Sequence, residues 1–215
     1  MARRELALSF SGSGLMTFWH FGVASALAEH RIMERVARVH GTSGGAAAAA
    51  MLLMAPEKIG ETLRVFPRNF LRSPIPLVRD AMEELGMRPR ADARFAPHAT
   101  SLGLRNEILK VETPEDVVTA IAASCCLVPA GVRHRGRLYY DGGLSDPLPV
   151  DLSLPTIRVS VFAGGDIAPA SRALSLRNAH AILDTALLNK TRAPLRFDEG
   201  REAGLRFLDG FSLDD

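Results

Sequence analysis

The chain has 215 residues, 47% of them hydrophobic and 23% charged, a composition that excludes disordered, collagen-like and coiled-coil chains. Its 26 basic and 24 acidic residues leave a formal net charge of +2, and the arginines are scattered, so nucleic acid is not an expected partner. We expect a single domain over residues 1–215, because this length supports one hydrophobic core but not comfortably two.

The first predicted elements lie in Leu6–Ala28, a stretch without any charged side chain. Its length also matches a membrane span, but the serines and glycines of its first half would leave polar groups in hydrocarbon. We therefore predict a buried strand at Leu6–Phe10, a tight turn at Ser11–Gly14 and a buried helix from Leu15 to about His30.

The same order of strand, glycine turn and helix follows directly. Val36–His40 is a short apolar strand, Gly41–Gly45 is a glycine-rich turn, and Ala46–Ala55 is a strong helix former that Pro56 ends. Two such units in the first 55 residues predict an α/β layered domain.

The later elements are predicted from apolar runs and from the prolines and glycines between them. In chain order they are helices within Pro56–Gly86 with a break at Arg72–Pro76, a loop at Arg88–Thr100, a helix from Thr113-Pro114 to Cys125 ended by Pro129, strands at Arg137–Tyr140 and Ile157–Phe162, and helices at Leu176–Lys190 and Asp198–Leu208.

Ser43 is the first candidate for chemistry. It is the serine of a G-x-S-x-G pattern, Gly41-Thr42-Ser43-Gly44-Gly45, between a predicted strand and a predicted helix. The glycines permit a sharp turn that presents the hydroxyl beside a helix N-terminus, where it could attack a carbonyl. The alternative is a plain helix N-cap serine.

Two further turns could complete such a site. Gly12-Ser13-Gly14 frees backbone N–H groups at a helix start and could hold a phosphate or an oxyanion, or be a simple turn. Asp141, in Asp141-Gly142-Gly143 after a predicted strand, could accept the serine proton as general base, or form an ordinary Asx-type turn.

These motifs, in this order, resemble the patatin-like phospholipase family, and most of all its branch containing adipose triglyceride lipase. The similarity runs from about Leu6 to Leu208. The segments that carry it are Leu8–Gly14, His20–Leu27, Gly41–Gly45, Ala122–Pro129, Asp141–Pro149 and Gly204–Leu208.

The resemblance implies a three-layer α/β/α sandwich with a central mixed, mostly parallel sheet. It also implies a dyad of Ser43 as nucleophile and Asp141 as base without a catalytic histidine, and an oxyanion hole formed by Gly12, Ser13 and Gly14. The implied enzyme is a serine lipid acyl hydrolase that cleaves fatty-acyl esters of glycerolipids, triacylglycerol or phospholipid, through an acyl-enzyme.

The chain departs from the family pattern in three places. Thr17 stands at the position of the last glycine of the oxyanion turn, Leu15 and Met16 stand where many members have a small residue and an arginine, and Ala91–Glu112 looks shorter than the strand pair expected there. Leu15 and Met16 match the animal-type branch, whereas Thr17 and the shortened segment keep open a non-catalytic or weakly active lipid-binding module with the same fold.

A Ser-His-Asp α/β-hydrolase is a lesser alternative, because His180 follows Asp141 in the chain order of that fold. His180 lies in a predicted helix, whereas a triad histidine usually lies on a loop. We interpret His20 as a core histidine and the adjacent Cys125 and Cys126 as buried small residues, since their spacing suits neither a disulfide framework nor a zinc site.

We expect no metal or organic cofactor. The expected partner is a lipid substrate at a membrane or lipid-droplet surface, with any activator protein unknown. The expected location is cytoplasmic, peripherally attached to that surface. Leu71–Val78 could dock there, because apolar residues lie beside arginines, or could equally be a core-packing segment.

Overall fold

The computed structural model describes residues 5–65, 74–127, 129–162, 164–169 and 192–211, and its framework is one mixed sheet. The strands are β1 (Leu6–Phe10), β2 (Val36–Thr42), β3 (Phe95–Ser101), β4 (Arg105–Ile108), β5 (Val132–His134), β6 (Arg137–Tyr140) and β7 (Thr156–Val159). They are arranged in the order β5-β6-β3-β2-β1-β7, with β4 paired to β3.

The sheet has a parallel half and an antiparallel half. Strands β7, β1, β2 and β3 pair in parallel, while β4 and β6 pair antiparallel to β3 and β5 pairs antiparallel to β6. The predicted α/β class with a mixed sheet is confirmed.

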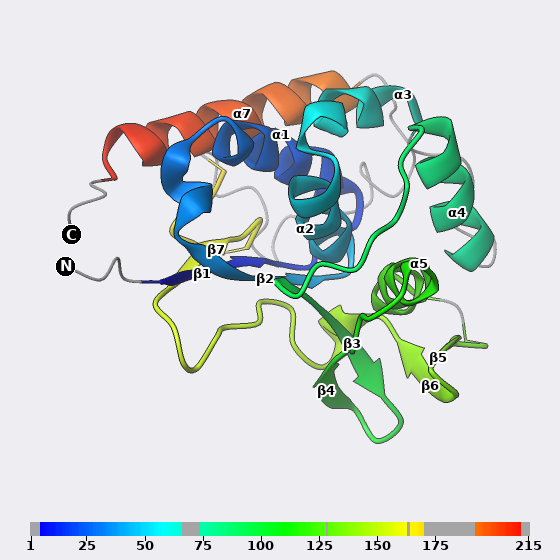
Figure 1. Cartoon of the computed structure of the whole chain (residues 1–215). Coiled ribbons are helices and arrows are strands. Elements are labelled where there is room, and N and C mark those ends of the chain that lie inside the picture. The colour runs from blue at the N-terminus through cyan, green and yellow to red at the C-terminus, as the bar shows by residue number, and fades with distance from the viewer. Residues whose placement is uncertain (1–4, 66–73, 128, 163, 170–191, 212–215) are drawn as a thin grey trace.

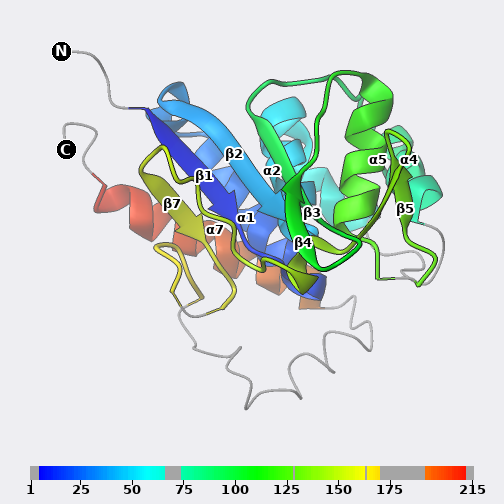
Figure 2. The same cartoon turned by 90° about the horizontal axis from the view of Figure 1, so that it is seen from below.

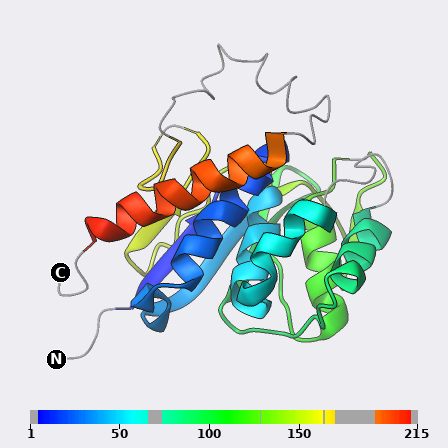
Figure 3. The same ribbon diagram turned by 90° about the horizontal axis from the view of Figure 1, so that it is seen from above.

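The described helices are α1 (Thr17–Ala28), α2 (Gly44–Met54), α3 (Thr62–Val65), α4 (Pro74–Glu84), α5 (Pro114–Ser124) and α7 (Ala193–Asp209). Helices α1, α2 and α7 lie side by side above the sheet in Figure 1 and in front of it in Figure 3, and the view from below in Figure 2 shows them behind β1, β2 and β7. None of the described helices combines the length and the apolarity that a membrane span requires.

The core lies between this helical layer and the sheet. Trp19 and Phe21 of α1 and Phe10 of β1 are fully buried, and every residue of α2 is buried. The prediction that Leu6–Ala28 is a buried strand, a turn and a buried helix is confirmed. Helix α7 packs directly against α1. The contact is so close that a Cβ on Gly200 would overlap the backbone of Trp19.

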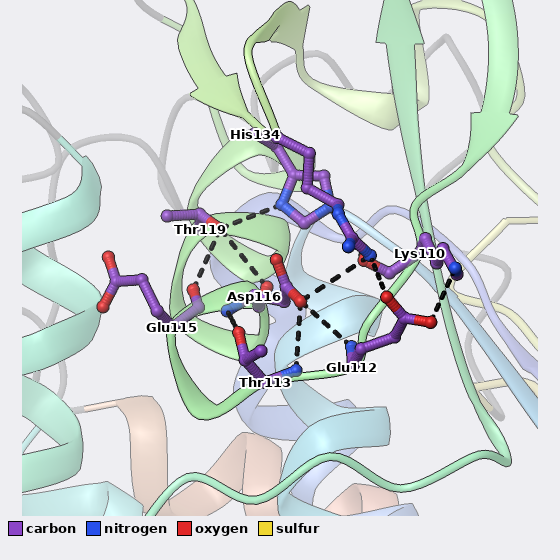
Figure 4. A network of polar contacts seen from close by, with 8 residues as sticks. Lys110, Glu112, Thr113, Glu115, Asp116, Thr119 and His134 are labelled. Atoms are coloured by element: carbon purple, nitrogen blue, oxygen red, sulfur yellow. Dashed lines mark hydrogen bonds and ion pairs between the residues drawn. The ribbon is translucent and has the colours of Figure 1, made fainter.

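Helix α5 begins as its sequence predicts. Thr113 Oγ1 accepts a hydrogen bond from the Asp116 N–H, and Asp116 Oδ2 accepts one from the Thr113 N–H, which together form a capping box. Pro114 occupies the first turn, where no helical N–H is needed. Figure 4 shows this network, which also joins Thr119 of the helix to His134 of β5. The helix ends at Ser124, before Pro129.

Two predictions for the middle of the chain are wrong. Pro74 and Pro76 lie in the first turn of α4 rather than in a break, because a proline in the first turn sacrifices no helical hydrogen bond. The predicted loop at Arg88–Thr100 contains β3, which pairs with β4, so Ala91–Glu112 does hold a strand pair. All seven residues of β3 are buried, which removes the alternation that would identify it in the sequence.

The other predicted elements lie in the second half of the chain. The strand at Arg137–Tyr140 is confirmed, the strand predicted at Ile157–Phe162 spans Thr156–Val159, and the last helix begins at Ala193, earlier than predicted. The helix predicted at Leu176–Lys190 lies outside the described residues.

Candidate active site

Ser43 lies in a sharp turn between β2 and α2. Its backbone has φ 53° and ψ −128°, a combination that costs a non-glycine residue conformational strain. This turn brings backbone segments on either side of Ser43 into very close contact, which only glycine can accommodate. A Cβ on Gly41 would collide with Gly45 and Ala46, and a Cβ on Gly45 would overlap the Phe10 carbonyl. Both glycines of the G-x-S-x-G pattern are therefore required by packing, and Ser43 is left partly exposed.

Asp141 faces Ser43 from the other half of the sheet. The Ser43 hydroxyl donates a hydrogen bond of 2.7 Å to Asp141 Oδ2, across 98 positions in the sequence. The other carboxylate oxygen, Oδ1, accepts a hydrogen bond of 2.8 Å from the Gly143 N–H. This second contact fixes the carboxylate plane, so that Oδ2 points at the hydroxyl.

Asp141 is only 5% exposed as a residue, and burial is the largest influence on the pKa of its carboxyl group. Desolvation raises the pKa of Asp141, while the hydrogen bonds from Ser43 and Gly143 counter part of that rise. A carboxylate with a raised pKa is a stronger base than a solvated aspartate, which suits the removal of a proton from a serine hydroxyl.

Strand β3 brings the two residues together. His98 of β3 pairs with Thr42, directly before Ser43, and Thr100 pairs with Tyr140, directly before Asp141. The Thr100 hydroxyl also donates a hydrogen bond of 2.7 Å to the Asp141 carbonyl. The two turns therefore follow strands that meet on one shared neighbour.

The glycine turn after β1 lies against the same site. A Cβ on Gly12 would be 3.8 Å from Ser43 Cβ. The Gly12 N–H donates a hydrogen bond of 2.8 Å to the Pro147 carbonyl and so is not available to a substrate oxygen. Within the described part of the chain, the N–H groups of Ser13 and Gly14 have no such acceptor, and both residues are at least partly exposed. Of the three predicted oxyanion donors, the geometry leaves Ser13 and Gly14.

Comparison with known proteins relates the chain to one family. The family model described as patatin-like phospholipase matches residues 8–95. Human patatin-like phospholipase domain-containing protein 4 is 28% identical, with 79% of this chain and 77% of that protein aligned. These matches support the patatin-like phospholipase family for this chain.

Two other relatives are longer than this chain. Rat patatin-like phospholipase domain-containing protein 2 is 30% identical over 94% of this chain. The aligned region is 50% of that relative, so the chain spans about half of the relative's length. Human omega-hydroxyceramide transacylase is 28% identical over 76% of the chain and 35% of its own length. These patatin-like relatives support a lipid acyl hydrolase in general terms.

Thr17, which the resemblance places at the last glycine of the oxyanion turn, has a structural role in this site. Its hydroxyl donates a hydrogen bond to the Gly14 carbonyl and lies 3.1 Å from Ser13 Oγ. Both hydroxyls pack against Gly44, where a Cβ would overlap them. The threonine therefore closes the turn from within and connects it to the first residue of α2.

The histidines considered from the sequence take no part in the described site. His20 is fully buried in α1, where burial lowers its pKa to about 3 and keeps the ring neutral, so the interpretation as a core histidine is confirmed. The expectation that a core histidine has all its hydrogen bonds is wrong here, because in the part of the chain that the structure describes the buried Nδ1 of His20 has no hydrogen-bond partner. His180 lies outside the described residues. Within the described residues, no group of His, Cys, Asp and Glu side chains could hold a metal ion.

Sequence reasoning missed two residues that contact the dyad. Thr100 lies in the strand that was predicted as a loop, and Ser124 lies at the end of α5, where its hydroxyl accepts a hydrogen bond from the Ser43 N–H. A polar residue in the otherwise apolar run Ala120–Cys126 is the signal that could have identified Ser124.

Proposed function

We propose that this protein is a serine lipid acyl hydrolase that cleaves fatty-acyl esters of glycerolipids through a Ser43–Asp141 dyad and an acyl-enzyme. The observation that carries the proposal is the 2.7 Å hydrogen bond from the Ser43 hydroxyl to a buried carboxylate oxygen. A partly exposed serine on a strained turn, held by a desolvated base, has the arrangement that nucleophilic catalysis needs.

The reaction would proceed in two steps. Ser43 Oγ attacks the ester carbonyl while Asp141 takes the hydroxyl proton, and the Ser13 and Gly14 N–H groups stabilise the oxyanion. The tetrahedral intermediate collapses to the acyl-enzyme, and Asp141 returns the proton to the departing glyceride oxygen. Asp141 then takes a proton from water, whose oxygen attacks the acyl carbon, and the proton passes back to Ser43 Oγ as the fatty acid leaves.

The proposed substrate is triacylglycerol or a phospholipid, and the names of the patatin-like phospholipase relatives support the phospholipid. Such a substrate is presented at a membrane or lipid-droplet surface, so we propose a cytoplasmic enzyme that attaches peripherally. Residues 71–73 of the predicted docking segment Leu71–Val78 lie outside the described residues. Within 74–78, Ile75 and Val78 pack against the core, whereas the half-buried Leu77 is not part of that packing, so we propose Leu77 for docking.

An acyl-enzyme can also pass its acyl group to an alcohol other than water. The similarity to a protein named omega-hydroxyceramide transacylase makes lipid acyl transfer the second candidate function. The two differ in the acceptor alone, because the Ser43 acyl-enzyme is common to both. Free fatty acid release favours hydrolysis, and a new lipid ester formed from an added alcohol favours transfer.

A fluorophosphonate probe tests the proposal. The wild-type protein should label at Ser43, and Ser43→Ala should not, while Ser25→Ala on α1 serves as the matched control and should label normally. Turnover of a panel of triacylglycerol, phospholipid and galactolipid then assigns the substrate. A well-folded wild-type protein that neither labels nor releases fatty acid would instead be a lipid-binding module.

A further inference from the structure

The last turn of α5 and the residues that follow it contact both members of the dyad. The Ser43 N–H donates a hydrogen bond of 2.8 Å to Ser124 Oγ, and the Asp141 N–H donates one of 2.9 Å to the Cys126 carbonyl. Two positions in one short stretch thus hold the backbones of two residues that lie 98 positions apart.

The Ser124 hydroxyl has a defined direction. Its side chain is fully buried, and its own proton is donated to the His98 carbonyl over 2.6 Å. A hydroxyl has one proton and two lone pairs. Because the proton is committed to His98, the oxygen presents a lone pair to the Ser43 N–H.

The carbonyl that receives this proton is itself fixed. His98 lies in β3, and its ring contacts His40 Nδ1 at 2.8 Å and Asn106 Oδ1 at 3.1 Å. Gly142 packs so tightly on the same carbonyl that a Cβ there would overlap it. The chain of contacts therefore runs from the nucleophile turn through Ser124 to the strand that supports the turn of Asp141.

Ser43 needs such support because its conformation is unfavourable. A residue with φ 53° and ψ −128° persists only when its surroundings hold it, and the N–H of a helix N-cap has no acceptor inside the helix. The Ser124 hydroxyl supplies that acceptor. If it is lost, the turn can relax and move Ser43 Oγ away from Asp141.

We propose that Ser124 is a positioning residue, whose hydroxyl holds the Ser43 N–H and so keeps the nucleophile within hydrogen-bond distance of Asp141. This inference rests on the proposed hydrolase function. A displacement of about 1 Å at a reacting group can reduce a rate by about a hundredfold. The loss should fall on kcat rather than on KM, because Ser124 is buried and does not contact the substrate.

The test compares variants at Ser124 on a soluble short-chain p-nitrophenyl ester, so that lipid docking plays no part. Ser124→Cys keeps nearly the same volume but replaces the hydroxyl with a weak acceptor. Ser124→Ala removes the acceptor, whereas Ser124→Thr keeps a hydroxyl at this position. Thr119→Val is the matched control. It removes a hydroxyl from the same helix, but this hydroxyl bonds to Glu115 and His134 and does not contact the site.

We expect Ser124→Cys and Ser124→Ala to lower kcat by about tenfold to a hundredfold with KM within about twofold. The rate of fluorophosphonate labelling should fall by a similar factor. Ser124→Thr should recover most of the lost kcat, and Thr119→Val should behave as wild type. Amide exchange at Ser43, followed by NMR, should become faster in Ser124→Cys than in wild type.

A folded Ser124→Cys variant with wild-type kcat and labelling rate would overturn the inference, and so would an equal loss of kcat in Thr119→Val. Failure of the proposed function gives a different pattern, since the wild type and Ser43→Ala would then be equally inactive and unlabelled. In that case unchanged Ser43 amide exchange in Ser124→Cys would still refute the positioning role, and faster exchange would support it.

Discussion

Replacing Asp141 with asparagine separates the chemical role of this side chain from its structural one. The amide has nearly the shape of the carboxylate, and its single oxygen can still accept the hydrogen bond from the Gly143 N–H. Its NH₂ group then occupies the place of Oδ2, 2.7 Å from Ser43 Oγ in the wild type. There it donates a hydrogen bond and cannot take a proton, so Ser43 loses its base.

The expected loss in kcat/KM is about a hundredfold to ten-thousandfold, the usual contribution of a positioned general base. This corresponds to about 3–5 kcal/mol of transition-state stabilisation. Asp141→Asn should leave the free energy of unfolding nearly unchanged or increase it. Because burial raises the pKa of Asp141, the folded state disfavours the charged carboxylate, and a neutral amide relieves that penalty.

The assay is turnover of a soluble ester between pH 4 and 9, with urea unfolding measured in parallel. In wild type, activity should fall as the solution is acidified through the pKa of Asp141, at a pH above the usual aspartate range, because the protonated carboxyl cannot accept a proton. Asp146→Asn is the matched control, since Asp146 lies in the same loop and its carboxylate contacts Asn106 and the Leu148 N–H. Wild-type kcat/KM in a folded Asp141→Asn variant would refute the dyad.

Three further predictions concern the core, the helical layer and the lipid surface. His20→Leu should flatten the acid loss of stability seen in urea unfolding. Folded His20 has a pKa of about 3, so below pH 6.5 the unfolded chain binds the extra proton and stability falls by about 1.4 kcal/mol per pH unit. Gly200→Ala should lower the free energy of unfolding by about 1–3 kcal/mol, since the new Cβ overlaps the Trp19 carbonyl, and Glu202→Ala on the exposed side of α7 should change little. Leu77→Glu should reduce flotation with lipid droplets while leaving soluble-ester turnover intact.

Each of these has a contrary result. An unchanged pH slope in His20→Leu would mean that the buried ring does not resist protonation. A Gly200→Ala variant as stable as wild type would mean that α1 and α7 separate readily at that contact. Equal flotation of Leu77→Glu and wild type would move the docking surface away from the segment 71–78.

Local sequence patterns predicted the elements whose causes are local. The strand, glycine turn and helix appear at Leu6–Ala28 and again around Ser43, because short apolar runs, glycines and alanines determine them without help from distant residues. The start of α5 was equally readable, since Thr113, Pro114 and Asp116 form its cap among themselves.

The pattern failed where the surroundings decide the structure. The residues of β3 include Pro97, His98 and two alanines, which do not favour a strand by themselves. They form a strand because β2, β4 and β6 all pair with it. Ser124 was missed for the same reason, since both of its hydrogen-bond partners lie far away in the chain.

The sequence by itself determined which chemical groups are available: a hydroxyl in a glycine turn, a carboxyl after a strand, and a third turn with free N–H groups. Tertiary structure alone decided that the Ser43 hydroxyl and the Asp141 carboxylate meet at 2.7 Å and that this carboxylate is buried enough to become a stronger base. It also decided that the Gly12 N–H donates its hydrogen bond to the Pro147 carbonyl. Distance and desolvation depend on how strands pair and on what covers them, and no short stretch of residues encodes either one.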